Sequence, residues 1–342
     1  MFTKILYTIV ITIFIFITTG LLLPKTVHME RTIEIDRPAA TVFTLVNGFS
    51  TFSTWSPWLE RDPGIVYDLS GPATGVGARL SWHGNPRRVG AGLQEITQSI
   101  PWSLVRMHVE FDQLGKASSY FQIDPVVRGT RLTWSFDADL VEGRSFFGAL
   151  LNRYFALFFD HWFGAEYERG LSRLKQFAES LPAADFSDIE VEILQVEPLD
   201  ILYVVTDSKR SGEGVTSGLA EAYQEITALM VEESIEMQSQ PMAITRAQNT
   251  GNYELSAAIP VTHTDIALTG AVRAGKSPAG RAVRVVHRGP YDRMATSYEK
   301  LAAYMAINGI GEGRVSWEHY ISDPGKTPPV DTVTHIYFLV EQ

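Results

Sequence analysis

The residues best suited to chemistry lie near the C-terminus, where Glu318 stands among aromatic residues in the run Trp317-Glu318-His319-Tyr320. Asp323-Pro324 follows this run, and Arg288-Gly289-Pro290-Tyr291 precedes it. Aromatic rings stack on flat apolar molecules and on organic cations, while a carboxylate neutralises a positive charge or orients a water molecule. These residue types predict a site for an apolar or cationic small molecule.

Strand alternation decides which of these side chains can share a face. In a strand from Val315 to Ile321, Glu318 and Tyr320 point to one side, and Trp317 and His319 point to the other. We therefore expect Glu318 and Tyr320 to share a ligand site, with Trp317 at its lip or packed elsewhere. A glutamate that simply faces solvent from a strand is the alternative.

Three more residues of the second half are candidates for the same ligand site. Tyr223 and Tyr298 lie on two predicted helices and could line it, although helix aromatics more often belong to the core. His335 alternates with Tyr337 on the last strand, where a half-buried structural histidine is the alternative to a ligand contact.

In the first half, tryptophans are the candidate cavity residues. Trp55-Ser56-Pro57-Trp58 could gate a cavity, or Trp55 and Trp58 could form an aromatic plug that seals it. Trp82 lies on a predicted strand and could face the same cavity, although a strand tryptophan is core by default.

Composition excludes several classes of site. The 342 residues carry a net charge of −10, which argues against nucleic acid because phosphate binding requires a basic surface. The chain has no cysteine, so disulfides, thiolate zinc sites and cysteine nucleophiles are excluded. No spacing of histidines and carboxylates indicates a metal, and we expect neither a metal nor a cofactor.

One motif misleads. Gly270–Ser277 fits the phosphate-loop pattern, but that chemistry needs a helix N-terminus directly after the loop. Here Pro278-Ala279-Gly280 follows, and then a predicted strand begins. A linker between two repeats explains the segment better than a nucleotide site.

The N-terminus predicts a membrane anchor. Ile5–Leu23 is apolar apart from Thr, Tyr and Gly, which matches the ~20 residues needed to cross a bilayer. A cleaved signal peptide is the alternative, but no small-residue cleavage site follows the run. A short N-terminal tail favours a cytoplasmic N-terminus, so we expect a single-pass cell-membrane protein whose soluble domains are extracytoplasmic.

Between residues 27 and 181 the pattern predicts a strand, short helical pieces, an antiparallel meander and a long final helix. The predicted strands are Val27–Asp36, Gly77–Gly84, Gly90–Ser99, Ser103–Phe111, Lys116–Val126 and Gly129–Leu140. The final helix, Ser145–Leu181, has an apolar stripe that includes Phe147, Phe158, Trp162, Leu171 and Leu174. Five motifs occur in order: Pro38-Ala39-Ala40-Thr41-Val42-Phe43, Trp55-Ser56-Pro57-Trp58, Gly71-Pro72 to Gly77, Trp82-His83-Gly84 and Gly129-Thr130-Arg131-Leu132-Thr133-Trp134. This segment resembles the polyketide cyclase/dehydrase branch of the START and Bet v 1-like superfamily. The resemblance implies a helix-grip fold with a cavity for apolar ligands between the sheet and the final helix.

The second half shows a weak internal duplication. A strand (Val191–Asp207), a helix (Val215–Glu236) and two further strands are followed by a second strand (Arg281–Arg288), a second helix (Tyr291–Asn308) and two last strands. With its Gly-Pro-Tyr and Trp-Glu motifs, this half is similar to GyrI-like effector-binding domains, which implies a groove between two β-α-β-β units for hydrophobic or cationic compounds. The position of Glu318 matches that motif.

These inferences define an α+β protein with an anchor (residues 1–26), a helix-grip domain (27–181), a linker (182–190) and a duplicated β-α-β-β domain (191–342). Its predicted role is to bind a hydrophobic, lipid-like or cationic small molecule for sensing, sequestration or delivery. Some GyrI-like proteins hydrolyse electrophilic compounds, so the alternative is a hydrolase with Glu318 as general base and Tyr320 orienting water or substrate. Protein-interaction platforms with closed cavities are a third possibility.

Overall fold

The computed structural model describes residues 2–112, 115–206, 213–248, 253–323 and 325–340. The chain divides into two compact units, Met1–Ser187 and Asp188–Gln342. Both contain one antiparallel sheet with helices on it, which confirms the predicted α+β class. Asp207, Pro324 and Glu341, which fall in predicted strands and motifs, lie outside the described residues.

Unit 1 contains a seven-stranded antiparallel sheet in the order β1-β7-β6-β5-β4-β3-β2. Its strands are β1 (Thr26–Ile35), β2 (Val66–Ser70), β3 (Arg79–His83), β4 (Ala91–Ile100), β5 (Leu104–Phe111), β6 (Gly115–Pro125) and β7 (Thr130–Asp139). Every strand except β2 is predicted by the sequence. Most of β2 is exposed at the edge of the sheet, so it lacks the apolar alternation that reveals the others.

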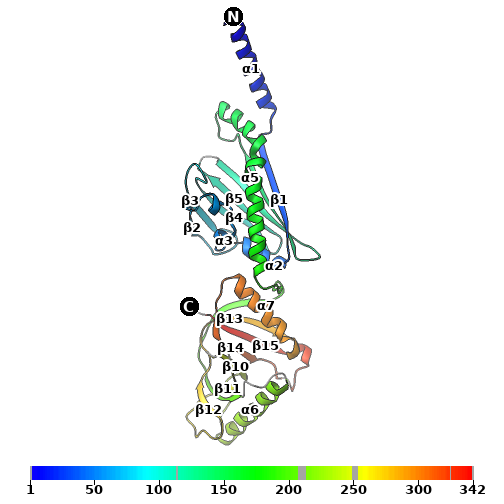
Figure 1. Ribbon diagram of the computed structural model, residues 1–342. Coiled ribbons are helices and arrows are strands. Elements are labelled where there is room, and N and C mark those ends of the chain that lie inside the picture. The colour runs from blue at the N-terminus through cyan, green and yellow to red at the C-terminus, as the bar shows by residue number, and fades with distance from the viewer. Residues whose placement is uncertain (1, 113–114, 207–212, 249–252, 324, 341–342) are drawn as a thin grey trace. The chain divides into compact units, whose positions relative to one another are not determined.

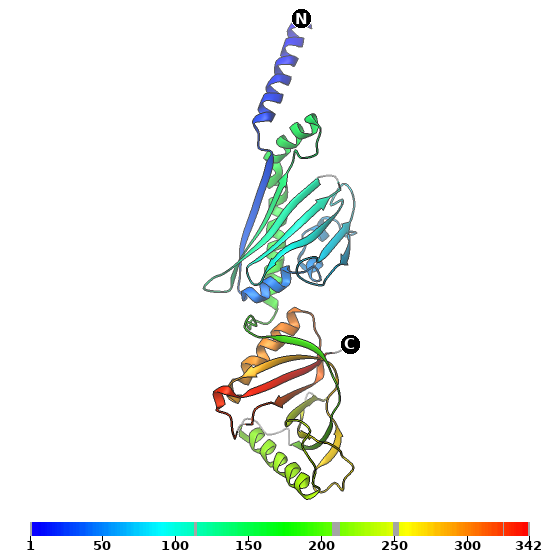
Figure 2. The same cartoon turned by 180° about the vertical axis from the view of Figure 1, so that it is seen from behind.

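Three short helices, α2 (Ala39–Val46), α3 (Phe52–Trp55) and α4 (Trp58–Arg61), lie between β1 and β2 in the chain, and the long helix α5 (Phe146–Ser180) follows β7. Figure 1 shows α5 crossing one face of the sheet, and Figure 2 shows the opposite face. The side chain of Ser145 caps α5 by accepting a hydrogen bond from the Gly148 amide at 3.3 Å. This sheet, closed by its final helix, is the predicted helix-grip arrangement.

Arg31 on β1 holds α5 against the sheet. Its Nη2 lies 2.9 Å from Oδ1 of Asp160, and its Nε donates to Oε1 of Glu168 at 2.8 Å. Gly164 lies between these carboxylates on α5, and a Cβ atom there would collide with the Arg31 guanidinium. The missing side chain therefore allows helix and strand to approach closely.

The first half of α5 corrects one expectation. The sequence predicts an apolar stripe on this helix that packs against the sheet, and Leu171 and Leu174 do so with 2% and 0% exposure. Phe147, Phe158 and Trp162 belong to the same predicted stripe, yet they are 69%, 53% and 48% exposed. Helical periodicity identifies an apolar face without identifying what covers it.

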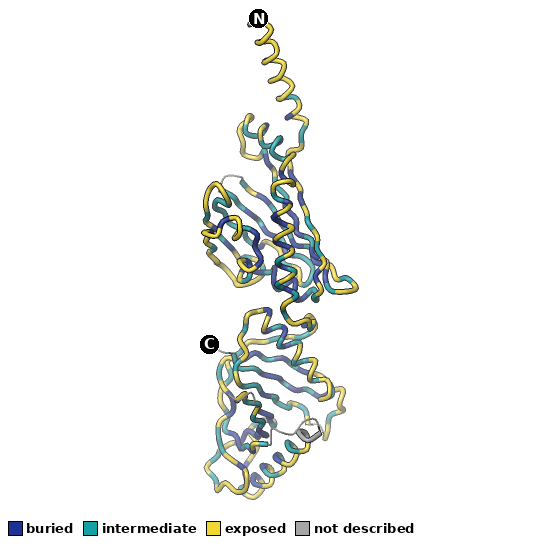
Figure 3. Tube along the Cα trace, in the orientation of Figure 1, coloured by how far each residue is buried: buried dark blue, intermediate teal, exposed yellow. Residues whose placement is uncertain are grey.

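The N-terminal helix α1 (Phe2–Leu22) contains one segment, Lys4–Leu22, that is long and apolar enough to cross a membrane. Helix α1 is exposed along most of its length (Figure 3). A signal sequence near an N-terminus can also be this long and apolar.

Unit 2 contains an eight-stranded sheet in the order β12-β9-β11-β10-β14-β15-β13-β8. Its strands are β8 (Val191–Val196), β9 (Asp200–Thr206), β10 (Met242–Ala247), β11 (Tyr253–Pro260), β12 (Arg273–Lys276), β13 (Gly280–Arg288), β14 (Glu312–Tyr320) and β15 (Val333–Val340). In each half, the third strand of the β-α-β-β unit lies between the first and the second: β11 lies between β9 and β10, and β15 lies between β13 and β14. The two halves join through the antiparallel pair of their second strands, β10 and β14. This arrangement is the predicted duplication.

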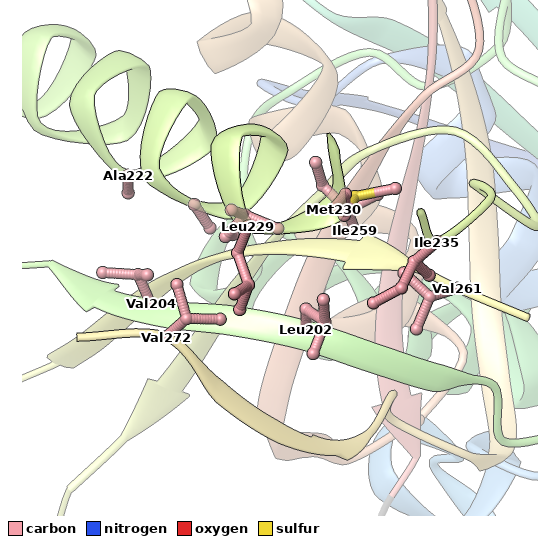
Figure 4. Packing of buried hydrophobic residues seen from close by; sticks show 11 residues of the cluster. Leu202, Val204, Ala222, Leu229, Met230, Ile235, Ile259, Val261 and Val272 are labelled. Atoms are coloured by element: carbon pink, nitrogen blue, oxygen red, sulfur yellow. The ribbon is translucent and has the colours of Figure 1, made fainter. Parts of the chain in front are cut away.

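Each half of unit 2 contributes one long helix, α6 (Glu213–Glu232) or α7 (Met294–Ile307), and the short turns η1 (Tyr291–Arg293) and η2 (Pro329–Asp331) complete the unit. Helix α6 buries Ala222, Leu229 and Met230 against β9 and β11 (Figure 4). Helix α7 buries Leu301 and Met305 against β13 and β15.

Two local predictions for unit 2 have different outcomes. The single strand expected from residue 191 is two strands, because the chain turns at Glu197-Pro198-Leu199, after which β9 pairs with β11 while β8 pairs with β13. The phosphate-loop pattern contains strand β12, and strand β13 rather than a helix follows it. The geometry that phosphate binding requires is therefore missing there.

Candidate ligand-binding site

Glu318 lies at the centre of the helix-bearing face of unit 2. The register places Glu318 opposite Ala243 on β10 and opposite Ile336 on β15. One row of facing residues crosses the sheet: Val204, Ala257, Ala243, Glu318, Ile336 and Val285. The first members of this row pack under α6 and the last under α7. Glu318 therefore occupies the same face as both helices, where the two halves of the unit meet.

Two tyrosine hydroxyls bind the Glu318 carboxylate. Tyr298 on α7 donates to Oε1 at 2.9 Å, and Tyr320, two residues along β14, donates to Oε2 at 2.5 Å. Each carboxylate oxygen has two lone pairs and keeps capacity for another partner. Glu318 itself is only partly buried.

Two more tyrosines extend the aromatic surroundings. The ring of Tyr291 in η1 lies 5.7 Å from that of Tyr320, edge to face, and is 40% exposed. Tyr223 on α6 donates its hydroxyl to the Met242 carbonyl at 2.7 Å, one residue from Ala243. The sequence predicted Tyr223, Tyr298 and Tyr320 as site residues and missed Tyr291, although the Gly289-Pro290-Tyr291 turn was visible in the chain.

The tyrosine hydroxyls remain protonated. Burial raises the pKa of Tyr298, Tyr320 and Tyr223, and the negative charge of Glu318 raises all three further. Burial also raises the pKa of Tyr291, with a smaller contribution from Glu318. A protonated phenol can donate a hydrogen bond, so Tyr298 and Tyr320 fix the orientation of the carboxylate.

Trp317 and His335, both predicted ligand contacts, lie on the opposite face of the sheet. Trp317 is 2% exposed, and its ring stacks on that of Tyr337 at 4.6 Å in a separate hydrophobic cluster. His335 faces His319 across β14 and β15, on that same side. The structure therefore does not bring Trp317 or His335 to Glu318, because alternation sends neighbouring strand residues to opposite faces.

The facing pair His319 and His335 predicts an acid sensitivity. Burial lowers the pKa of both histidines from 6.5. His335 lowers the pKa of His319 further, and Arg284 and Arg288 lower that of His335, while a backbone hydrogen bond with Gln240 and the charge of Glu192 oppose these effects at His319 and His335 respectively. The unfolded chain then binds more protons than the folded chain below about pH 6.5, so stability should fall as pH decreases through that value. Thermal unfolding of unit 2 measured from pH 8 to pH 5 should show this loss, and His319→Asn should flatten it.

His263 provides the control for this measurement. It is exposed, and its ring nitrogen contacts only the neighbouring Thr262 hydroxyl among the described partners. His263→Asn should leave the pH dependence of unfolding as in the parent chain. An unchanged slope in His319→Asn would contradict the assignment to this pair.

The candidate tryptophans of unit 1 are separate from one another. Trp55 is 1% exposed, with its ring edge-to-face on Phe52 at 4.9 Å and on Trp134 at 5.8 Å. Trp58 is partly buried and meets Phe163 of α5, whereas Trp82 donates its indole N–H to the Val89 carbonyl at 3.3 Å. Rings from α3, β6 and β7 surround Trp55.

A pocket of about 620 Å³ opens at one end of unit 1, lined by residues that include Arg37, Trp102, Arg128 and Asp185. The Arg37 guanidinium already donates to the Leu181 carbonyl at 2.9 Å, to the Asp36 carbonyl and to the Glu179 carbonyl. Arg37 thus caps the C-terminus of α5, so its role in the wall of this pocket is structural.

Among the residues that the structure describes, no group of three histidines and carboxylates could hold a metal ion.

Two protein families match the chain. Residues 26–179 match the family described as polyketide cyclase / dehydrase and lipid transport, and residues 189–341 match the GyrI-like small molecule binding domain. No curated protein matches the chain.

Several solved structures are similar to parts of the chain. A hydrolase from Listeria innocua is 16% identical over 44% of this chain and 92% of that one, with a TM-score of 0.33. The EcmrR C-terminal domain is 20% identical over 45% and 99%, with a TM-score of 0.37, and Ara h 8.0201 is 11% identical over 45% and 99%, with a TM-score of 0.33. Together with the folds of the two units, the family matches show that the chain joins a polyketide cyclase / dehydrase and lipid transport domain to a GyrI-like small molecule binding domain.

Proposed function

We propose that the GyrI-like domain binds an organic cation with a flat apolar surface, and that Glu318 supplies the counter-charge. The observation that carries this proposal is the Glu318 carboxylate, which accepts hydrogen bonds from the hydroxyls of Tyr298 and Tyr320 beside the exposed ring of Tyr291. A cation next to aromatic rings gains a favourable interaction with their faces, and the remaining carboxylate lone pairs can pair with its charge.

We further propose that α1 is a retained membrane anchor, so that the chain senses, sequesters or delivers its ligand at the membrane, with the soluble domains on the extracytoplasmic side. Arg153 of α5 donates to the carbonyls of Leu21 and Leu23 at 2.7 and 3.0 Å, and Tyr154 donates to the Phe16 carbonyl at 2.6 Å. Cleavage after α1 would remove the Phe16 and Leu21 acceptors. These contacts support retention over a cleaved signal sequence.

The ligand proposal can be tested with a matched pair of dyes, cationic thioflavin T and its uncharged benzothiazole analogue. The full chain in nanodiscs should bind the cation at least about tenfold more tightly than the neutral dye, a difference of about 1.4 kcal/mol. Nanodiscs without protein correct for dye that enters lipid. Equal affinity for both dyes would contradict a counter-charge role, and native mass spectrometry of the same sample would identify any molecule that copurifies.

A further inference from the structure

The first half of α5 carries an apolar stripe on its exposed side. Phe147, Leu151, Phe158 and Trp162 are 69%, 59%, 53% and 48% exposed. At 3.6 residues per turn, these four side chains point within about 60° of one another around the helix. Asp160 points away from them, because it pairs with Arg31 on the sheet side. An apolar patch of this size on a protein surface usually marks a site that binds another protein or a membrane.

This exposed stripe lies beside helix α1. The ring of Tyr154 stacks on Phe16 with centroids 4.4 Å apart, and its hydroxyl reaches the Phe16 carbonyl. A Cβ atom on Gly20 would come within 2.4 Å of Leu150, so glycine allows α1 to approach α5 closely at this point. The contacts with Arg153 described above cap the last turn of α1. The start of α5 is therefore attached to the last two turns of α1.

These contacts set the depth of α5 relative to a bilayer. Phe16 precedes the end of α1 by six residues, which is about 9 Å along a helix. If Lys4–Leu22 crosses the membrane, Tyr154 lies about 9 Å inside the end of the span, which is within the depth of about 5–10 Å that the apolar face of an interfacial helix reaches. The exposed stripe shares that level with Tyr154, because Leu151 and Phe158 stand about one turn on either side of it.

We propose that the first half of α5 is a membrane-interface helix, whose stripe of Phe147, Leu151, Phe158 and Trp162 inserts into the lipid surface beside the point where α1 leaves the bilayer. Tryptophan and other large apolar side chains favour this boundary, and a helix with one apolar face lies in its plane. The helix-grip unit is then held at the membrane by two elements. This inference rests on the proposed anchoring by α1.

The chain contains no cysteine, so each introduced cysteine carries a nitroxide spin label at a single known site. We would label Leu151→Cys and Phe158→Cys in the stripe, Ile11→Cys in the middle of α1, and Ser172→Cys as the control. Ser172 is exposed on the same helix, about 30 Å from Leu151. The full-length variants are reconstituted in vesicles of dioleoylphosphatidylcholine, and collision rates with oxygen and with a water-soluble nickel complex are measured.

The expected result is that labels at positions 151 and 158 resemble the label at position 11, with frequent oxygen collisions and few nickel collisions, whereas the label at position 172 collides freely with nickel. Stripe labels in water, with the label at position 11 in lipid, would overturn the interface helix while leaving the anchor intact. A label at position 11 in water would refute the anchor and this inference together. Stripe labels shielded from both reagents, with spin–spin broadening, would show that a second copy covers the stripe and would also overturn the proposal.

Discussion

Replacing Glu318 with glutamine is expected to weaken thioflavin T binding by about 30- to 150-fold. Removing one charge of a close, partly desolvated pair costs about 2–3 kcal/mol, which corresponds to that factor. Glutamine keeps the shape of the side chain: its carbonyl oxygen can accept a hydrogen bond from one of the two hydroxyls of Tyr298 and Tyr320, and its amide N–H can donate to the oxygen of the other. Fluorescence titration of the full chain in nanodiscs measures the loss, and affinity for the uncharged dye should change by less than about threefold.

Glu312→Gln is the matched control for this substitution. Glu312 lies on the same strand, β14, and is exposed, so the same change in charge should leave thioflavin T binding unaltered. Equal losses in Glu312→Gln and Glu318→Gln would assign the effect to net charge and remove Glu318 from the site. Tyr298→Phe and Tyr320→Phe keep both rings but remove the hydroxyls that orient the carboxylate, and each should cost about 1–2 kcal/mol of binding free energy.

The hydrolase alternative gives a different response to the same variant. If Glu318 activates water as a general base, Glu318→Gln should abolish turnover of an electrophilic substrate while binding of a neutral ligand survives. A binding domain for cations loses affinity and has no turnover to lose. Product formation by the parent chain, measured with an epoxide or an activated ester and lost in Glu318→Gln, would favour the enzyme.

Trp55→Ala should reduce the free energy of unfolding of unit 1 by about 3–5 kcal/mol, the usual cost of deleting a large buried aromatic side chain. Trp55 is almost fully buried, and its ring touches Phe52, Phe121 and Trp134. Differential scanning calorimetry of the full chain in detergent micelles measures the effect. Thioflavin T is expected to bind unit 2 and to raise the unfolding temperature of that unit. Trp55→Ala should therefore lower the other unfolding transition, which thioflavin T leaves unchanged.

Two further variants separate a plug from a gate. Trp55→Phe should cost less than Trp55→Ala, because it keeps a ring and removes an indole N–H that has no hydrogen-bond partner among the described residues. Trp58→Ala should also have a small effect, since Trp58 is only partly buried. A Trp55→Ala chain that keeps its stability within about 1 kcal/mol and gains binding of an apolar dye would identify Trp55 as a gate.

Local patterns in the sequence were sufficient to predict the elements and their order. Period-two alternation and turn residues located six of the seven strands of unit 1 and the long helix α5. The same alternation placed Glu318 and Tyr320 on one side of β14 and Trp317 on the other, which is how the structure arranges them. These properties depend only on neighbours along the chain, so no tertiary information was needed.

The composition of the site depended on tertiary structure. Tyr298 reaches Glu318 because α7 crosses the same face of the sheet, and Tyr291 joins them because the turn before α7 lies beside β14. Only the pairing of β14 with β15 shows that His335 lies on the opposite face from Glu318. Pairings between distant segments depend on strand order and helix crossing, which periodicity within one element does not specify.

The sequence by itself determined that this protein has an apolar N-terminal helix, two α+β domains and a carboxylate among aromatic residues, because composition and periodicity are local properties of the chain. Only the tertiary structure decided which apolar faces become core. Trp55 is enclosed by rings from α3, β6 and β7, whereas Trp162, on an equally apolar stretch, stays exposed. Burial depends on what packs against a side chain: Trp55 is covered by Phe121 and Trp134 from distant strands, whereas the ring partners of Trp162 are Phe155 and Phe158 of its own helix.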